Sequence, residues 1–396
     1  MEKVVFLLKA REFGGMEVIL LDWLSRIDYS MISVAVCSYG TQTLWERIAS
    51  LGLPIETVPL TISDEEPFWK VFSKWRSLFS SIQAGKIVIL EGFIGEIGLT
   101  PLMAARWRSR QGRTLLYETN WGRSLFPDPA TTRRKLHYGF LPGVGLYRYR
   151  ELVKQRVRGA LVHHTFVMSQ GIKDNLVSQY GYPADRTSVL HHGVDTRRFQ
   201  ASTTVRLEFR RASGIPEDAT VMVCHGRLVP RKRVDRILKA FEVLSVEHTN
   251  LWLLLTCYGP LKEEVERMAV ASSASGRIKL VGFQEDSTAV LKASDIYVLS
   301  SNDEGFGIAV VEALSTGLVC VATDGPGPRD IIQNGQNGFL VEATNDGVLL
   351  GLRRALGLLP DERLRLVRRA RKTVEDQFEI GPAIHAALDA MEIPKR

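Results

Sequence analysis

The feature that most constrains the fold is a regular alternation of short apolar runs with longer helical patterns. In the first half, β-type runs at residues 3–8, 32–37, 55–58, 87–90 and 114–117 are separated by helical segments. The same alternation restarts near residue 205 and continues to residue 322. Strands that alternate with helices predict parallel sheets covered by helices on both faces. We therefore expect an α/β fold with two Rossmann-like halves. The turn and extended pattern HHGVDTRRF (residues 191–199) predicts a division near residue 199.

Composition excludes several classes of protein. Hydrophobic residues make up 45% of the 396-residue chain and charged residues 24%, as in ordinary globular proteins. No apolar run approaches the ~20 residues that span a bilayer. The N-terminal stretch MEKVVFLLKAREFGG predicts a first strand and not a signal peptide. The cysteines lack CxxC spacing and predict buried free thiols in a reducing cytosol, not metal ligands; they are Cys37, Cys224, Cys257 and Cys320.

The positive charge is concentrated in one region. The formal net charge is +7, but residues 101–160 hold 13 Lys or Arg and three acids, so this window carries 13 − 3 = +10. Aromatic residues are interleaved with the basic ones between residues 122 and 158. Such a segment suits an anionic membrane surface or a lipid phosphate, although a solvated basic face explains it equally well. No nucleic-acid-binding motif accompanies the charge, so a nucleic-acid partner is not expected.

The stretch SNDEGFGIAVVEALSTG (residues 301–317) predicts a glycine-rich loop that runs into a helix. A helix start opened by Gly305 and Gly307 leaves backbone N–H groups exposed, and the helix dipole makes this place suitable for a phosphate. The carboxylates of Glu304 and Glu312 suit hydroxyl groups on either side. A nucleoside diphosphate sugar contains all these parts. Two solvated glutamates on an ordinary loop and helix are the alternative.

A second motif, GRLVPRKR (residues 226–233), follows a predicted strand. Arg227 and Lys232 are five residues apart around Pro230, so both can point at one anion. Arginine offers a planar fork of donors and lysine a point charge. A solvated basic loop is the alternative, because Arg231 and Arg233 are there too.

The spacing Glu304–x7–Glu312, with EGFG at its start, resembles the signature of retaining glycosyltransferases of family 4, which have the GT-B fold. The resemblance implies that Glu304 contacts the transferred sugar and that backbone amides at Phe306 and Gly307 hold its hydroxyls. It implies that Glu312 binds the ribose, and that Arg227 and Lys232 hold the diphosphate. It covers most of the chain and is most specific between residues 221 and 340.

Three further places carry the resemblance or depart from it. The turn Gly14-Gly15-Met16-Glu17 resembles the family's GG-x-E turn, which implies that Gly15 approaches the diphosphate or the acceptor. The turn 282–284 implies that Phe283 lies against the nucleotide base, although a core position suits Phe283 equally. Where many members carry a strand-end His, this chain has LEGFIGEIG and LYETNWG. Glu118 is a candidate for orienting an acceptor hydroxyl, or for capping the next element.

These observations together predict a GT-B protein with an interdomain cleft. The expected domains are residues 1–199 for the acceptor, residues 200–377 for the donor, and a final helix, 378–396, that crosses back to the first domain. The expected activity is retaining transfer of a sugar from a UDP- or GDP-sugar to a hydroxyl of a glycan, lipid-linked or small-molecule acceptor. No DxD motif is present, so neither a metal nor a cofactor is expected. The alternatives are a non-catalytic nucleotide-sugar-binding partner and a nucleotide-sugar 2-epimerase.

The predicted site has two sets of residues. The catalytic and substrate-binding residues are given below, after the expected location.

PLACEHOLDER The catalytic set is Glu304, Arg227, Lys232 and Glu118, and the substrate-binding set is Gly15, Phe283, Phe306, Gly307, Ile308 and Glu312.

Overall fold

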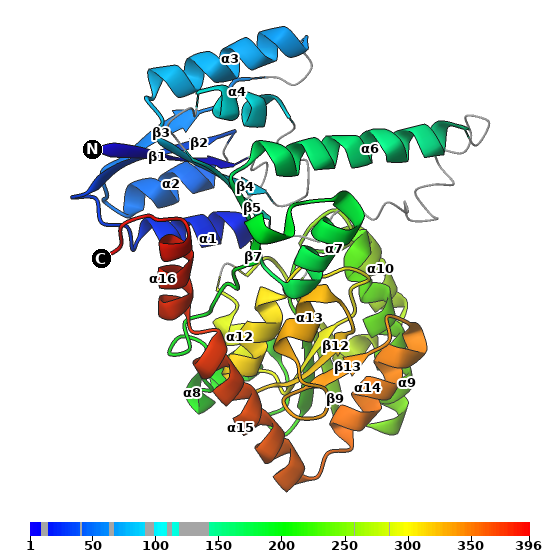
Figure 1. Ribbon diagram of the computed structural model, residues 1–396. Helices are drawn as coiled ribbons and strands as arrows, with labels where there is room; N and C mark the ends of the chain where they lie inside the picture. The colour runs from blue at the N-terminus through cyan, green and yellow to red at the C-terminus, as the bar shows by residue number, and fades with distance from the viewer. Residues whose placement is uncertain are drawn as a thin grey trace. The chain divides into compact units, whose positions relative to one another are not determined.

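The chain divides into two compact units in a computed structural model (Figure 1). Unit 1 is Met1–His191 together with Ile384–Arg396, and unit 2 is His192–Ala383. The structure describes residues 1–8, 15–39, 42–62, 67–91, 99–108, 113–118, 142–256, 258–284 and 286–396, without the side chains of residues 107, 108, 118, 142–149 and 151.

Unit 1 is built on a parallel sheet of seven strands in the order β3-β2-β1-β4-β5-β6-β7. The central strands are apolar throughout because helices cover both of their faces, and Val4–Leu8 of β1 are all buried. The strands are β1 (Glu2–Leu8), β2 (Ile32–Ser38), β3 (Ile55–Pro59), β4 (Lys86–Glu91), β5 (Thr114–Glu118), β6 (His164–Val167) and β7 (Thr187–Val189).

Helices lie on the two faces of this sheet. Figure 1 shows α1 and α2 on one face and α3 and α4 on the other. The predicted strand at residues 160–168 begins too early, since Ala160 and Leu161 complete α6 and β6 starts at His164; a short apolar run does not distinguish a helix end from a strand. The helices are α1 (Gly15–Leu24), α2 (Gln42–Ser50), α3 (Phe68–Ser81), α4 (Thr100–Arg108), α6 (Pro142–Leu161) and α7 (Gln170–Tyr180).

Unit 2 repeats the plan with a six-stranded parallel sheet in the order β10-β9-β8-β11-β12-β13. Its strands are β8 (Thr220–Cys224), β9 (Leu251–Thr256), β10 (Ile278–Val281), β11 (Ile296–Leu299), β12 (Val319–Thr323) and β13 (Phe339–Val341). Its helices are α8 (Thr203–Ser213), α9 (Val234–Glu247), α10 (Lys262–Ala271), α11 (Thr288–Lys292), α12 (Ile308–Thr316), α13 (Pro326–Ile331), α14 (Asn345–Leu356) and α15 (Pro360–Gln377). Helix α9 packs beside α14, and α12 beside α15.

The last helix, α16 (Ile380–Ala390), carries the chain into a segment that belongs to unit 1. The buried Lys86 donates from Nζ to the carbonyl oxygens of Met391 (2.9 Å) and Glu392 (2.8 Å). Ile27 and Lys395 form an antiparallel bridge. None of the helices that the structure describes is long and apolar enough to cross a membrane.

The units divide at slightly different residues from those expected at 199 and 377. Val194 bridges to Glu379, and the carbonyl of Phe199 accepts from Ser315 Oγ and from Arg371 Nη1, both at 2.7 Å. These bonds hold residues 192–199 and 378–383 in unit 2.

Candidate active site

The loop 300–307 and helix α12 form the centre of the candidate site in unit 2. Gly307 is the N-cap of α12, with φ +103°, and no side chain caps the helix start. Only glycine adopts this backbone conformation without strain. Gly317, with φ +91°, ends the helix. The predicted loop and helix are confirmed, and the first N–H groups of α12 are left to an external acceptor.

A neighbouring turn sets the position of this loop. Thr323 Oγ1 donates to the Ser301 carbonyl (2.6 Å), and the Gly327 N–H donates to the Glu304 carbonyl (3.0 Å). A Cβ at Gly327 would lie 2.2 Å from Cα and from the carbonyl oxygen of Phe306. Only a glycine lets the start of α13 lie this close, so the DGPGPRD turn acts as a template for the sugar-binding loop.

Glu304 lies at the centre of a polar cluster. Its carboxylate forms an ion pair with Lys232 Nζ, accepts a hydrogen bond from Ser301 Oγ at 3.2 Å, and lies 3.9 Å from Arg231 Nη1. The exposed fractions of the Lys232 and Glu304 side chains are 18% and 12%. Both are therefore largely enclosed, yet solvent or a ligand can reach them.

The electrostatics of the cluster keep Glu304 ionised. Burial by itself raises the pKa of Glu304, but the positive charges of Lys232 and then Arg231 outweigh it and hold the pKa below its ordinary value. The neighbouring Asp303 has a raised pKa, chiefly because it is buried. A carboxylate with fixed negative charge thus lies between two cations at the mouth of α12.

The basic loop is bonded directly to the glutamate loop. Arg231 Nη1 donates to the Asp303 carbonyl (2.9 Å), and the Asn302 N–H donates back to the Arg231 carbonyl (2.8 Å). Ser300 Oγ lies 2.8 Å from the carbonyl of Lys232. The sequence interpretation left Arg231 in a solvated loop, whereas the structure places it in the cluster. The turn Pro230–Lys232, which presents these side chains, was the available signal.

Arg227 occupies a different part of the same loop. Its side chain is exposed, and its stem passes close to Gly259, where a Cβ would lie 3.0 Å from Arg227 Cγ. That Arg227 and Lys232 act on one anion stays a prediction.

Glu312 lies on α12 and accepts a hydrogen bond from Ser287 Oγ at 3.3 Å. Burial raises its pKa to about 7, against the lowering effects of Ser287 and the charge of Arg198. Arg198 is itself paired with Asp286, Nη2 to Oδ1 at 3.1 Å. Glu312 therefore changes protonation state near neutral pH, which its position in the sequence could not reveal.

Two further groups complete the surroundings. Phe283 is 56% exposed and meets the ring of Tyr258 edge-on at 5.0 Å, so the alternative of a core position for Phe283 is wrong. His225, which sequence reasoning missed, contacts Thr256 Oγ1 through Nδ1 at 3.2 Å. Burial and then the charge of Lys232 lower its pKa to about 4, so the ring is neutral at neutral pH.

The candidates in unit 1 are less fully described. Gly15 begins α1, while its neighbour Gly14 is outside the described residues. Glu118 ends β5, but its side chain is not described, and residues 119–141, which hold much of the basic window, also lie outside. Glu91 is fully buried in an ion pair with Arg158 of α6.

The described residues show no metal-binding cluster, that is, no group of three or more His, Cys, Asp or Glu able to hold an ion. Cys37, Cys224 and Cys320 are free thiols, and Cys257 lies outside the described residues.

Residues 205–373 match the family model described as Glycosyl transferases group 1. Lys232, Glu304 and Glu312 all fall inside this range. Lipopolysaccharide core biosynthesis glycosyltransferase LpsE of Rhizobium meliloti (strain 1021) is 31% identical over 41% of this chain and 47% of its own length. Putative glycosyltransferase EpsD of Bacillus subtilis (strain 168) is 30% identical over 40% and 42%. The chain spans about half the length of the curated relatives it matches.

Solved structures resemble the whole chain. A glycosyltransferase from Rickettsia africae ESF-5 has a TM-score of 0.77 at 16% identity, covering 99% of this chain and 98% of its own. Anabaena Alr3699/HepE in complex with UDP and glucose has a TM-score of 0.75 at 17% identity, covering 99% and 100%. The predicted GT-B class with two Rossmann-like domains is confirmed. The matches support a group 1 glycosyltransferase.

Proposed function

We propose that the protein is a retaining glycosyltransferase that moves a sugar from a nucleotide diphosphate sugar to an acceptor hydroxyl. The observation that carries this proposal is the enclosed but reachable Glu304–Lys232 pair beside the uncapped start of α12. A diphosphate suits the helix start and the cations, and a sugar suits the carboxylate.

Donor binding redistributes the charges of the cluster. Without a ligand, Lys232 neutralises Glu304. An arriving diphosphate takes up Lys232 together with Arg231 and Arg227, and the Glu304 carboxylate turns to the sugar hydroxyls. Glu312 accepts from the ribose hydroxyls, and the exposed ring of Phe283 lies against the base.

The transfer step breaks the bond between the anomeric carbon and the β-phosphate oxygen, and the electron pair leaves with the diphosphate. The acceptor oxygen forms a bond to the anomeric carbon on the same face, so the configuration is retained. The acceptor proton passes to the departing phosphate oxygen. Lys232, Arg231 and the N–H groups at Gly307 and Ile308 stabilise the charge that develops there. Because cationic side chains supply this charge, we expect the rate to be unchanged by EDTA.

The names of relatives support a choice of donor and acceptor. HepE was crystallised with UDP-glucose, and an Escherichia coli relative, 28% identical over 40% of this chain, is a UDP-Gal:alpha-D-GlcNAc-diphosphoundecaprenol alpha-1,3-galactosyltransferase. We therefore propose a UDP-sugar before a GDP-sugar, and a glycan or lipid-linked acceptor. A lipid-linked acceptor agrees with peripheral contact between the basic window and the inner face of the cytoplasmic membrane. Co-sedimentation should then be stronger with anionic than with neutral vesicles.

A panel of UDP-, GDP- and ADP-sugars tests the proposal. A thermal-shift screen identifies the donor, and product analysis with and without acceptors identifies the reaction. Transfer with the donor's anomeric configuration is expected. Conversion of the donor without any acceptor would indicate an epimerase. Binding without turnover across the acceptor panel would indicate a non-catalytic partner, and no binding at all would refute the proposal.

A further inference from the structure

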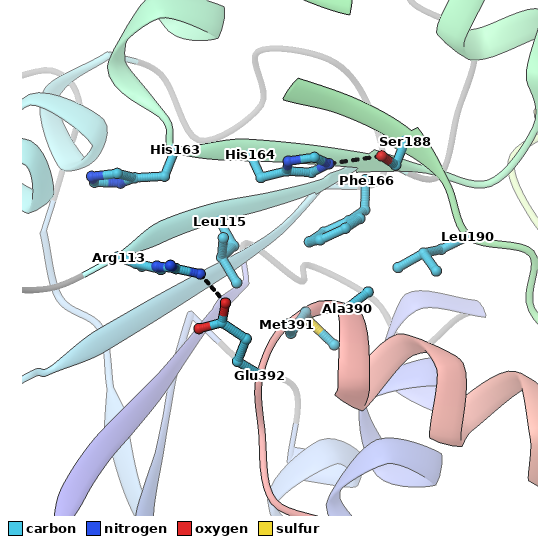
Figure 2. Close-up of a pocket in the computed structure, with 10 residues that line it drawn as sticks. All are labelled: Arg113, Leu115, His163, His164, Phe166, Ser188, Leu190, Ala390, Met391 and Glu392. Atoms are coloured by element: carbon cyan, nitrogen blue, oxygen red, sulfur yellow. Dashed lines mark hydrogen bonds and ion pairs between the residues drawn. The ribbon is translucent and has the colours of Figure 1, made fainter. Parts of the chain in front are cut away.

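Unit 1 contains a pocket of about 530 Å³ on one face of its sheet, away from the candidate active site (Figure 2). Alternate residues of a strand point to the same face, and Leu115, Phe166 and Leu190 from three successive strands form an apolar floor. The chain after α16 closes one side with Met391 and Glu392. The size and apolar floor are those of a small-molecule site, since such sites measure roughly 300–1,000 Å³.

The rim of the pocket is basic. Arg113 precedes β5, is 56% exposed, and forms an ion pair with Glu392 (Figure 2). Arg106 Nη1 lies 2.7 Å from His163 Nε2. Arg186 and Lys173 are close enough to act on His164, whose pKa is lowered by burial and then by these charges, with Asp185 opposing them. Cations thus outnumber the carboxylates of Glu392 and Asp185 around the pocket.

His163 lacks an acceptor for one of the donors that surround it. The Thr114 N–H donates to His163 Nδ1 at 3.0 Å, so the single proton of the neutral ring must lie on Nε2. Nε2 faces the Arg106 guanidinium, which has donors only. Two donors therefore face each other, and if the proton moves to Nδ1 the conflict moves with it to Thr114. An acceptor oxygen from outside the chain would resolve it.

We propose that this pocket binds a small organic anion with an apolar ring or branched chain. The apolar part packs on Phe166, Leu115 and Met391, and the anionic group takes up Arg113 in competition with Glu392. Arg113 and His163 lie just before the first residues of β5 and β6, at the amino ends of these strands. The ligand site of such a sheet lies at the carboxyl ends, so the pocket is separate from the proposed acceptor site.

Two dyes that differ in charge test the proposal by fluorescence titration of the full chain. The probes are anilinonaphthalene sulfonate, an aryl anion, and its neutral analogue phenyl-naphthylamine. We expect one site per chain for the anion, with weaker binding of the neutral dye. Arg113→Gln should weaken the anion about tenfold and leave the neutral dye unchanged. Glu392→Gln should strengthen the anion several-fold, because it releases Arg113. The control is Arg47→Gln, an exposed arginine on α2, which should have no effect.

Leu190→Trp supplies an independent check by filling the pocket, and both dyes should then be lost. The proposal is overturned if Arg113→Gln and Glu392→Gln leave anion binding unchanged, or if both dyes still bind to Leu190→Trp. It is also overturned if a UDP-sugar displaces the anion, since the dye would then report the donor site. Loss of dye binding alone leaves the UDP-sugar thermal shift intact, so the two proposals fail separately.

Discussion

The two units place a carboxylate in similar positions but in very different surroundings. Glu91 is the last residue of β4 and pairs with Arg158, and Glu304 follows β11 and pairs with Lys232. In unit 1 both side chains have an exposed fraction of 0%, whereas in unit 2 the fractions are 12% and 18%. A fully enclosed pair is out of a ligand's reach and serves to hold the fold together. An ion pair that remains partly open can exchange its partner for a ligand.

The strongest test of this comparison is Glu304→Gln. We expect the transfer rate to fall on the order of 100-fold or more, because the charged acceptor for the sugar hydroxyls is lost. The measurement is kcat for transfer from the donor found in the screen. Near-normal turnover would remove Glu304 from the site.

The counterpart in unit 1 is Glu91→Gln. It leaves the Arg158 guanidinium buried without its counter-charge, so we expect the free energy of unfolding to fall by about 3–5 kcal/mol. Urea unfolding measures this change. In the same assay Glu304→Gln should change stability by less than about 1 kcal/mol, because water can reach Lys232. The comparison breaks if the two variants are equally destabilised. The exposed Glu46→Gln is the control.

A smaller effect is expected at the cations. Lys232→Gln should weaken donor binding about tenfold, since one charge-assisted contact to the diphosphate is lost. Arg231→Gln should weaken it less, because part of Arg231 is occupied by the Asp303 carbonyl. Calorimetry with the nucleotide sugar measures both, and the exposed Lys239→Gln on α9 is the matched control. Unchanged affinity in both variants would exclude a role for these cations in holding the diphosphate.

The smallest effect is a pH dependence from Glu312. Its pKa is about 7 in the unliganded protein, and ribose hydroxyls donate to the ionised form. Donor affinity should therefore rise a few-fold as the pH increases through 7, and Glu312→Gln should flatten the profile. A UDP-sugar is the suitable ligand, because its diphosphate does not change charge in this range. A profile that is identical in both proteins would contradict the ribose assignment.

Local patterns in the sequence were sufficient for the α/β class, the strands and the start of α12. They were sufficient because alternating strands and helices, and glycines at a helix mouth, are set by neighbouring residues. The ion pair of Glu304 with Lys232 joins residues 72 apart, so spacing alone could not reveal it. The same holds for Arg231, for the enclosed environment of Glu312, and for the close approach at Gly327. Each depends on how separate strands bring their loops to one edge of the sheet.

The return of residues 384–396 to unit 1 has a consequence for how the protein is made. Domains usually fold as they leave the ribosome, with the N-terminal one first. Here every residue of unit 2 has been synthesised before the segment that supplies the Met391 and Glu392 carbonyls to Lys86. The N-terminal unit is therefore the last to be completed, and the nascent chain must keep the sheet around Lys86 from aggregating until translation ends.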